Sequence, residues 1–305
     1  MKAKAGNYRP DNTWSPDWPA VWIENRILYA SIAFTWHLDY MRSRLEQRSF
    51  DWDTAVVGGP AVKLVPTAFD GMEHVSLGDD TPSVLQRVNP MATKTSTGCI
   101  RSCEFCCVPH TEGKIRELPD WPDRPLLIDN NILATSQKHF DRVIDRLKEW
   151  PWTDFNQGMD ARLLNEYHAQ RLMELKRPMI RLALDSLDYV NDWISALEIL
   201  LAAGLPKTRI RSYALIGFDS DPDEAWKRCE YIESFGIKAL PMWFHELDAT
   251  KRNDVTEKQV AMGWSDFKRN RIMQWYYQHK DIRLRGRKGP DLFSHSSSTS
   301  SDDTA

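Results

Sequence analysis

Between residues 92 and 243 the chain alternates short apolar runs with longer amphipathic stretches. The short runs are rich in β-branched and other apolar residues and have the length of buried strands. We therefore expect six strands, at residues 92–97, 126–128, 153–156, 180–184, 209–216 and 238–243.

Helical periodicity separates these strands. A helix over residues 136–150 places its apolar side chains at the spacing of a single face. A second helix is expected over residues 189–203, followed by Gly204 at the position where a left-handed residue ends a helix. A third begins at Asp221, which is expected to cap it in a capping box completed by Glu224.

This alternation predicts an α/β fold. Strands that alternate with helices require right-handed crossovers and a parallel sheet. Six such units are too few to close an eight-stranded barrel, so we expect a partial (βα)6 barrel over residues 91–245. Ligands of such sheets bind at the carboxyl ends of the strands.

The flanking segments predict smaller units. Residues 1–90 are expected to form a small α/β unit, whose last strand ends at Gly58 and Gly59. Residues 246–290 are expected to form a helical extension that contains a helix over residues 265–278. Residues 291–305 are rich in Ser, Thr and Asp and are expected to be a disordered tail.

Composition bears on the cellular location of the protein and on the use of its cysteines. The net charge is −3, and no apolar run has the length of a membrane span or the pattern of a signal peptide. We therefore expect a cytoplasmic protein with no membrane partner. The chain has five cysteines, and four of them lie between positions 99 and 107. This clustering is unlike a disulfide framework and indicates metal binding.

The spacing of Cys99, Cys103 and Cys106 indicates which metal centre this is. Three thiolates spaced C-x₃-C-x₂-C in one loop can bind three irons of a [4Fe–4S] cubane. The fourth iron then has no protein ligand and is open to S-adenosylmethionine (SAM), whose sulfonium bond the reduced cluster can break.

With Phe105 before the last cysteine, this motif resembles the signature of the radical SAM superfamily. Residues 98–114 are similar to the cysteine loop of cobalamin-domain radical SAM proteins and of methylthiotransferases. The resemblance covers residues 92–243 as a fold. It implies formation of a 5′-deoxyadenosyl radical that acts on an unidentified substrate, and an external electron donor of the flavodoxin or ferredoxin type.

The resemblance also implies roles for residues at the strand ends. Phe105 is expected near the adenine of SAM, and Asp129 and Asn130 near its amino group, with a helix-entry turn as the alternative for the latter two. Arg162 is expected to hold the SAM carboxylate. Asp160 is expected either to orient Arg162 or to contact substrate, and it is the candidate catalytic residue.

Two further positions complete the expected SAM pocket. Asp185 follows the fourth strand and is expected to accept hydrogen bonds from the ribose, with a helix N-cap as the alternative. Gly217 follows the fifth strand and is expected to allow close backbone approach to the adenine, with a simple turn as the alternative.

The sequence before the cysteine motif limits which radical SAM reactions are expected. The N-terminal unit resembles the end of a cobalamin-binding domain, but it lacks the D-x-H-x-x-G motif and is interpreted as vestigial. No cysteine precedes Cys99, so methylthio transfer, which needs a second cluster, is not expected. Cys107 and Cys229 are interpreted as structural.

Two other classes of function remain open. Zinc could bind the three cysteines together with His110 or Cys107, in a non-catalytic module. A nucleic-acid or nucleoside modifier could use the basic stretch at residues 283–288.

Overall fold

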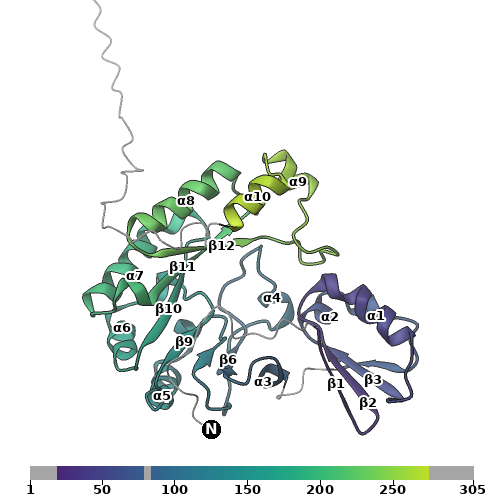
Figure 1. The fold of residues 1–305 in the computed structure, drawn as a ribbon. Coiled ribbons are helices and arrows are strands. Elements are labelled where there is room, and N and C mark those ends of the chain that lie inside the picture. The colour runs from purple at the N-terminus through teal and green to yellow at the C-terminus, as the bar shows by residue number, and fades with distance from the viewer. Residues whose placement is uncertain (1–18, 79–83, 275–305) are drawn as a thin grey trace, which may run out of the picture.

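The computed structural model describes residues 19–78 and 84–274. A small N-terminal unit and a larger α/β unit lie side by side (Figure 1). The larger unit carries the cysteine loop, and its sheet and helices contain most of the buried apolar side chains.

The larger unit is built on a six-stranded parallel sheet, which confirms the α/β fold class. The spatial order is β12-β11-β10-β9-β8-β5, so the six strands lie side by side in the order in which they follow one another in the chain. The strands are β5 (Ala92–Thr93), β8 (Leu126–Leu127), β9 (Thr153–Phe155), β10 (Pro178–Ala183), β11 (Ile210–Ile216) and β12 (Lys238–Trp243).

Four helices pack against one face of this sheet (Figure 1). They are α5 (Gln137–Leu147), α6 (Glu166–Met173), α7 (Val190–Ala202) and α8 (Pro222–Ser234). The sequence pattern predicts α5, α7 and α8. It misses α6, because that helix is short and buries only Ala169 and Leu172.

The helix ends follow local chemistry. Gly204 has a φ of +100°, and the bonds Gly204 N to Leu201 O and Leu205 N to Leu200 O form a Schellman motif that ends α7 as predicted. Asp221 caps α8 by accepting from the backbone N–H groups of residues 223 and 224. The expected capping box is wrong: the Glu224 carboxylate instead accepts from Arg228, one turn further along.

The first expected strand, residues 92–97, is also wrong as a single element. It divides into β5 and β6 (Ser96–Thr97), and β6 pairs antiparallel with β7 (Arg116–Glu117). The division occurs because Asp129 Oδ1 accepts hydrogen bonds from the backbone and hydroxyl groups of Thr95 and Ser96. These bonds take the chain out of the six-stranded sheet just before the cysteine loop.

The N-terminal unit is a four-stranded sheet in the order β1-β2-β3-β4. Its strands are β1 (Ala20–Glu24), β2 (Ile27–Ser31), β3 (Thr54–Gly58) and β4 (Val75–Leu77). Helices α1 (Leu38–Glu46) and α2 (Pro60–Leu64) contribute to its separate apolar core. Strands β1 and β4 were not predicted. The β1–β2 turn uses Asn25 and Arg26, both with positive φ, as a tight hairpin requires.

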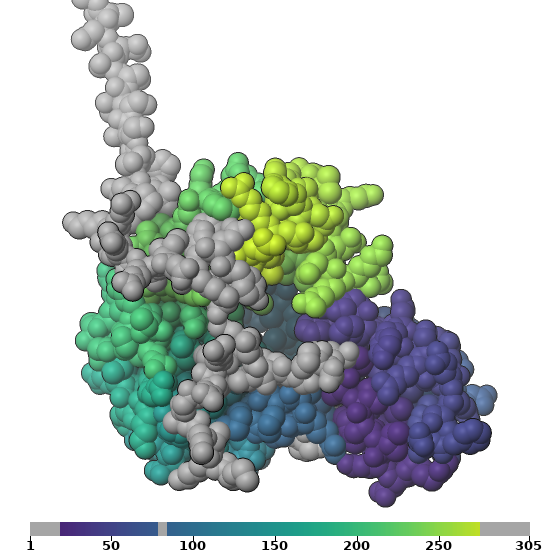
Figure 2. Space-filling view, in the orientation of Figure 1, coloured from purple at the N-terminus to yellow at the C-terminus, as the bar shows by residue number. Residues whose placement is uncertain are grey.

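The N-terminal unit contacts the larger unit beside the cysteine loop. Helix α3 (Val84–Val88) leads into β5, and α2 packs on α4 (Val108–Thr111), which follows the last cysteines. Thr35 Oγ1 donates to Ala249 O at 2.6 Å, and the Trp36 and His245 rings lie 4.8 Å apart. The surface is hollowed between the N-terminal unit and the C-terminal elements (Figure 2).

After β12 the chain forms α9 (Glu257–Ala261) and α10 (Asp266–Met273). Trp264 Nε1 donates to Ser220 O at 2.7 Å, which joins this region to the loop before α8. The helix expected over residues 265–278 begins as predicted, with Ser265 as the N-cap residue of α10. The described residues end at 274, so they do not include the end of that helix, the basic stretch at 283–288 or the expected tail. Of the helices described, none combines the length and the apolar character needed to span a membrane.

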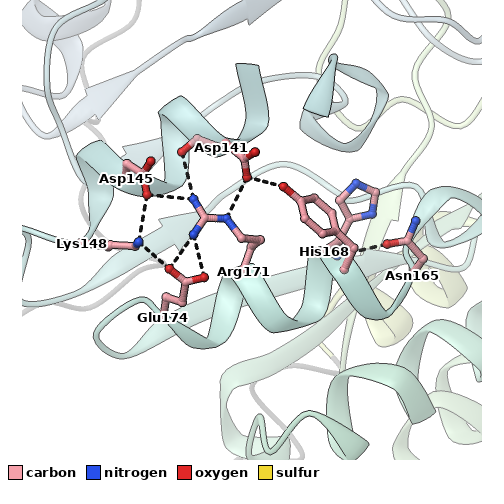
Figure 3. A network of polar contacts seen from close by, with 8 residues as sticks. Asp141, Asp145, Lys148, Asn165, His168, Arg171 and Glu174 are labelled. Carbon is pink, nitrogen blue, oxygen red and sulfur yellow. Dashed lines mark hydrogen bonds and ion pairs between the residues drawn. The ribbon is translucent and has the colours of Figure 1, made fainter. Parts of the chain in front are cut away.

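A polar network joins the outer surfaces of α5 and α6 (Figure 3). Arg171 of α6 is at its centre and donates to Asp141 Oδ1 and to Asp145 Oδ1 of α5, both at 2.8 Å. Glu174 accepts from Arg171 and pairs with Lys148. The Arg171 side chain is only 16% exposed, so its charge is compensated by several carboxylates rather than by water alone.

Candidate metal centre and cofactor site

The cysteine loop lies between β6 and α4. Cys99, Cys103 and Cys106 are half-buried free thiols, and a hydrogen bond of 3.0 Å from Cys106 N to Cys103 O forms a turn between the last two. Cys107 is the N-cap residue of α4. Cys229 is fully buried on α8, as predicted for a core thiol.

The start of the loop requires a glycine. Gly98 has a φ of +74°, and a Cβ atom there would lie 2.2 Å from the carbonyl oxygen of Lys114. Cys99 N donates to Gly113 O at 3.1 Å. The two ends of the loop are therefore held together directly beside the first cysteine.

Glu112 helps to hold the two ends of the loop together. Its carboxylate pairs with Lys94 and accepts from Gly98 N at 2.8 Å and from Asn130 Nδ2 at 2.7 Å. Burial acts to raise the pKa of Glu112, but Lys94 and the N–H donors outweigh it, so its pKa is lowered. Sequence reasoning missed both Lys94 and Glu112. It expected Asn130 at the SAM amino group, whereas the structure places the Asn130 amide on Glu112.

Burial acts on the thiols of both Cys103 and Cys106. Burial raises the pKa of the Cys106 thiol to about 11, with smaller contributions from Cys107, Cys103 and Cys99, while the backbone N–H of Val108 lowers it. Burial also raises the pKa of Cys103. Metal binding at these thiols would have to displace their protons.

The donor set fits an iron–sulfur cluster in kind and number. Three unpaired thiols come from one closed loop, and Cys99 Sγ accepts from Arg101 N at 3.4 Å and from Asn131 Nδ2 at 3.8 Å. Among the described residues, no group of three or more His, Cys, Asp or Glu side chains could hold a metal ion. The thiols of a cubane each bind a different iron, whereas the ligands of a single ion converge on one point.

Asp129 lies beneath the loop and is 4% exposed. Its Oδ1 holds Thr95 and Ser96, while its Oδ2 has no hydrogen-bond partner among the described residues. Asp129 also lines a small pocket with residues at the ends of β8 and β9, including Gln157 and Met159. Burial raises its pKa, and its four hydrogen bonds oppose that rise.

Asp160 and Arg162 form the most connected part of the site. Asp160 Oδ1 accepts from Arg162 Nε at 2.7 Å, and its Oδ2 accepts from Arg101 Nε at 2.8 Å and from Asn131 Nδ2 at 3.5 Å. Burial acts to raise the pKa of Asp160, but the two arginines lower it. The carboxylate thus links Arg162 to the cysteine loop, a geometry that matches the orienting role expected for it.

Arg162 itself lies over an aromatic ring. Its guanidinium carbon is 4.8 Å from the centroid of the Tyr189 ring, and its side chain is 34% exposed. The hydrogen bonds that it makes with described residues use Nε and the backbone N–H. Its two Nη groups are therefore available to a bidentate acceptor such as a carboxylate.

Asp185 follows β10 and accepts from Leu215 N at 3.1 Å through Oδ1. Burial raises its pKa to about 6, although the Leu215 N–H and the charges of Arg228 and Arg162 lower it. The adjacent short helix (Leu187–Tyr189) is capped by Ser186. Asp185 is therefore not the N-cap residue that formed the alternative interpretation.

The Phe105 side chain lies close to the segment that contains Gly217 and Phe218. The rings of Phe105 and Phe218 lie 5.5 Å apart, edge to face, so the cysteine loop contacts the end of β11. Gly217 has a φ of +82°, and a Cβ atom there would lie 2.5 Å from the Trp243 ring. The group that approaches Gly217 closely is thus the Trp243 ring, and the approach of an adenine at Gly217 stays a prediction.

Two sets of predicted residues are brought together. In the first set, Asp160 accepts hydrogen bonds both from Arg162 and from Arg101 of the cysteine loop. In the second, the Phe105 ring contacts Phe218, the residue after Gly217. Asp129 and Asn130 support the loop from below and do not contact Asp160 or Arg162 through any hydrogen bond found in the described part of the chain.

Comparison with known proteins does not assign the chain to a family. No protein-family model matches it. No curated protein matches it either.

Proposed function

We propose that this chain is a radical SAM enzyme. The observation that carries the proposal is the closed loop of three unpaired thiols at the edge of a parallel α/β sheet, with Arg162, Asp160 and Asp185 at the neighbouring strand ends. We interpret the sheet and its helices as a partial (βα)6 barrel. We also place the protein in the cytoplasm, where clustered thiols stay reduced.

Cys99, Cys103 and Cys106 are the proposed ligands of a [4Fe–4S] cluster. When bound, the cluster supplies one electron that breaks the sulfonium C–S bond of SAM and gives methionine and a 5′-deoxyadenosyl radical. The electron comes from an external flavodoxin- or ferredoxin-type donor, and the substrate is unidentified. The protein contributes binding, orientation and exclusion of water.

The chain's own residues suit these tasks. Arg162 presents its Nη groups for the SAM carboxylate, while Asp160 fixes the direction of its guanidinium through Nε. Asp185 offers Oδ2 to the ribose hydroxyls, because Oδ1 accepts from Leu215 N. Phe105 and Phe218 provide an apolar, aromatic wall suited to a purine ring.

Anaerobic reconstitution tests the proposal. We expect the full chain to take up about four irons and four sulfides, as a cubane requires. With SAM and a chemical reductant it should release 5′-deoxyadenosine. Tight zinc binding without SAM cleavage would reject the proposal in favour of a zinc module.

Adjacent cysteines supply a matched control. Cys106→Ser should lose the cluster and SAM cleavage, because it removes a proposed ligand. Cys107→Ser should keep both, because Cys107 makes no side-chain cap hydrogen bond to α4. Equal loss in the two variants would indicate damage to the loop rather than removal of a ligand.

The nucleic-acid alternative stays a prediction. Its basic stretch, residues 283–288, lies outside the described residues.

A further inference from the structure

Cys99 differs from the other cysteines of the motif in what surrounds its sulfur. Its Sγ accepts from the backbone N–H of Arg101 at 3.4 Å and from the side-chain amide of Asn131 at 3.8 Å. Among the hydrogen bonds of residues 19–78 and 84–274, Asn131 is the one side chain that donates to Cys99, Cys103 or Cys106. Asn131 follows β8 and is 3% exposed.

The orientation of the Asn131 amide is set by two acceptors. Nδ2 lies 3.8 Å from Cys99 Sγ and 3.5 Å from Asp160 Oδ2. A primary amide carries two N–H bonds, so it can serve both acceptors at once. The reversed amide would place its oxygen against a carboxylate and a sulfur, which both repel it.

Asp160 is itself held firmly. Arg101 Nε and Arg162 Nε donate to its two oxygens at 2.8 and 2.7 Å. A continuous chain of contacts therefore runs from Arg162 through Asp160 and Asn131 to Cys99. Its members come from three segments: the cysteine loop, the turn after β8 and the turn after β9.

This arrangement bears on the electron that the cluster must accept. Hydrogen bonds to the sulfurs are among the features that set the reduction potential of an iron–sulfur cluster. Reduction adds negative charge that the ligating sulfurs share, so an N–H donor stabilises the reduced state more than the oxidised state.

We propose that Asn131 is a positioning residue that raises the reduction potential of the cluster by donating to Cys99 Sγ, with Asp160 holding its amide in that orientation. This inference rests on the proposed function, because it requires a cluster at Cys99. It assigns Asp160 to the support of the cluster and of Arg162 and not to contact with substrate.

Potentiometric titration of the reconstituted holoenzyme, followed by the EPR signal of the reduced cluster without SAM, tests the proposal. Asn131→Leu should lower the midpoint potential. At a fixed potential we expect the ratio of reduced to oxidised cluster to fall about tenfold, which corresponds to ~59 mV for one electron. Asn191→Leu is the control, because Asn191 is exposed on α7 and makes no hydrogen bond to a cysteine sulfur among the described residues. It should retain the wild-type midpoint.

A second measurement does not depend on how well Asn131→Leu folds or binds the cluster. In protein made with ¹⁵N in the asparagine side chains, pulsed EPR of the reduced wild-type cluster should detect a ¹⁵N coupling. Asn191→Leu, at an exposed position on α7, should retain this coupling. Asn131→Gln should lose it, because its side-chain nitrogen is then unlabelled, which identifies Asn131 as the source of the coupling.

The outcomes separate this inference from the proposed function. A wild-type chain that takes up no iron and sulfide contradicts the proposed function. A loaded wild type that cleaves SAM but shows no ¹⁵N coupling, or an Asn131→Leu midpoint equal to that of wild type, overturns the role of Asn131 alone.

Discussion

At the scale of single residues, two positions of the proposed site lower the free energy of unfolding. Asp185 is a carboxylate that burial makes hard to ionise, with a pKa raised to about 6. Gly217 has a left-handed backbone against which an indole ring is packed. Both belong to the proposed SAM pocket, and functional sites commonly carry such costs.

Asp185→Asn should stabilise the chain at neutral pH. The folded protein disfavours the ionised carboxylate, so wild-type stability falls as the pH rises from about 4, the ordinary pKa of Asp, to about 6, its pKa in the fold. Asparagine keeps an acceptor for Leu215 N without the charge. We expect a gain on the order of 2 kcal/mol above pH 7, measured by denaturant unfolding.

The pH dependence identifies the cause of that gain. The advantage of Asp185→Asn should shrink as the pH falls through 6 and vanish near pH 4. Asp188→Asn is the control, because Asp188 is exposed and accepts from Ser186 Oγ. A gain of the same size at every pH would contradict the role assigned to the Asp185 charge.

Gly217→Ala should destabilise the chain by about 2–3 kcal/mol, because it adds overpacking to backbone strain. Gly71→Ala separates the two costs. Gly71 has the same φ of +82°, but nothing lies within 4 Å of where its Cβ would be. It should therefore show the strain alone, and equal losses of unfolding free energy in the two variants would exclude a clash with Trp243.

At the scale of elements, the periodic segments were predictable and the irregular ones were not. Strands β8 to β12 and helices α5 and α7 have patterns that local sequence determines, because the strands are short, largely buried runs and each helix buries apolar side chains at helical spacing. Strand β6 could not be separated from β5, because the division depends on Asp129, more than 30 positions away in the chain.

The candidate site shows the same limit. The cysteines were found by spacing, which is a local property of the chain. Lys94, Glu112 and Asn131 were missed because their importance comes from contacts that only the fold creates. The position of Glu112 directly before Gly113, at the end of the motif, was the one local signal that could have singled it out.

The network between α5 and α6 is expected to contribute to stability. Arg171→Leu should cost about 1 kcal/mol of unfolding free energy, because it leaves Asp141 and Asp145 without their shared partner. The loss should decrease at high salt, which can be followed by denaturant unfolding at two ionic strengths.

Arg26→Leu is the control for that prediction. Among the described residues Arg26 forms an ion pair with Asp53 only and also donates to Phe50 O at 3.1 Å, and the side chains of Arg26 and Asp53 are 58% and 64% exposed. An isolated exposed ion pair contributes little, so this variant should unfold like the wild type. If the two substitutions had equal effects, the network would have no more influence on stability than a single pair.

At the scale of the whole molecule, the N-terminal unit is a neighbour of the proposed metal centre. Its α2 packs on α4, which follows the cysteines, and Thr35 and Trp36 contact the segment after β12. The unit thus borders the cysteine loop on the side where the surface is hollowed (Figure 2).

Thr35→Val should loosen this junction. It removes the hydrogen bond to Ala249 O from a side chain that is nearly buried, at a cost of about 1 kcal/mol. Hydrogen exchange should become faster in β1–β4, with β9–β12 unchanged. Thr54→Val, at an exposed position on β3, should leave both regions as in wild type. Uniform acceleration throughout the chain would show that the two units unfold together.

The order of strands in the sheet has a consequence for synthesis. Because every strand of the six-stranded sheet pairs with the strand of that sheet that precedes it in the chain, each can join the sheet soon after it leaves the ribosome. The groups that surround Cys99 are complete once residue 162 has emerged, well before β10, β11 and β12 are made. We therefore expect the nascent chain to enclose its thiols early, so that they are sheltered from oxidants while nearly half of the protein is still to be translated.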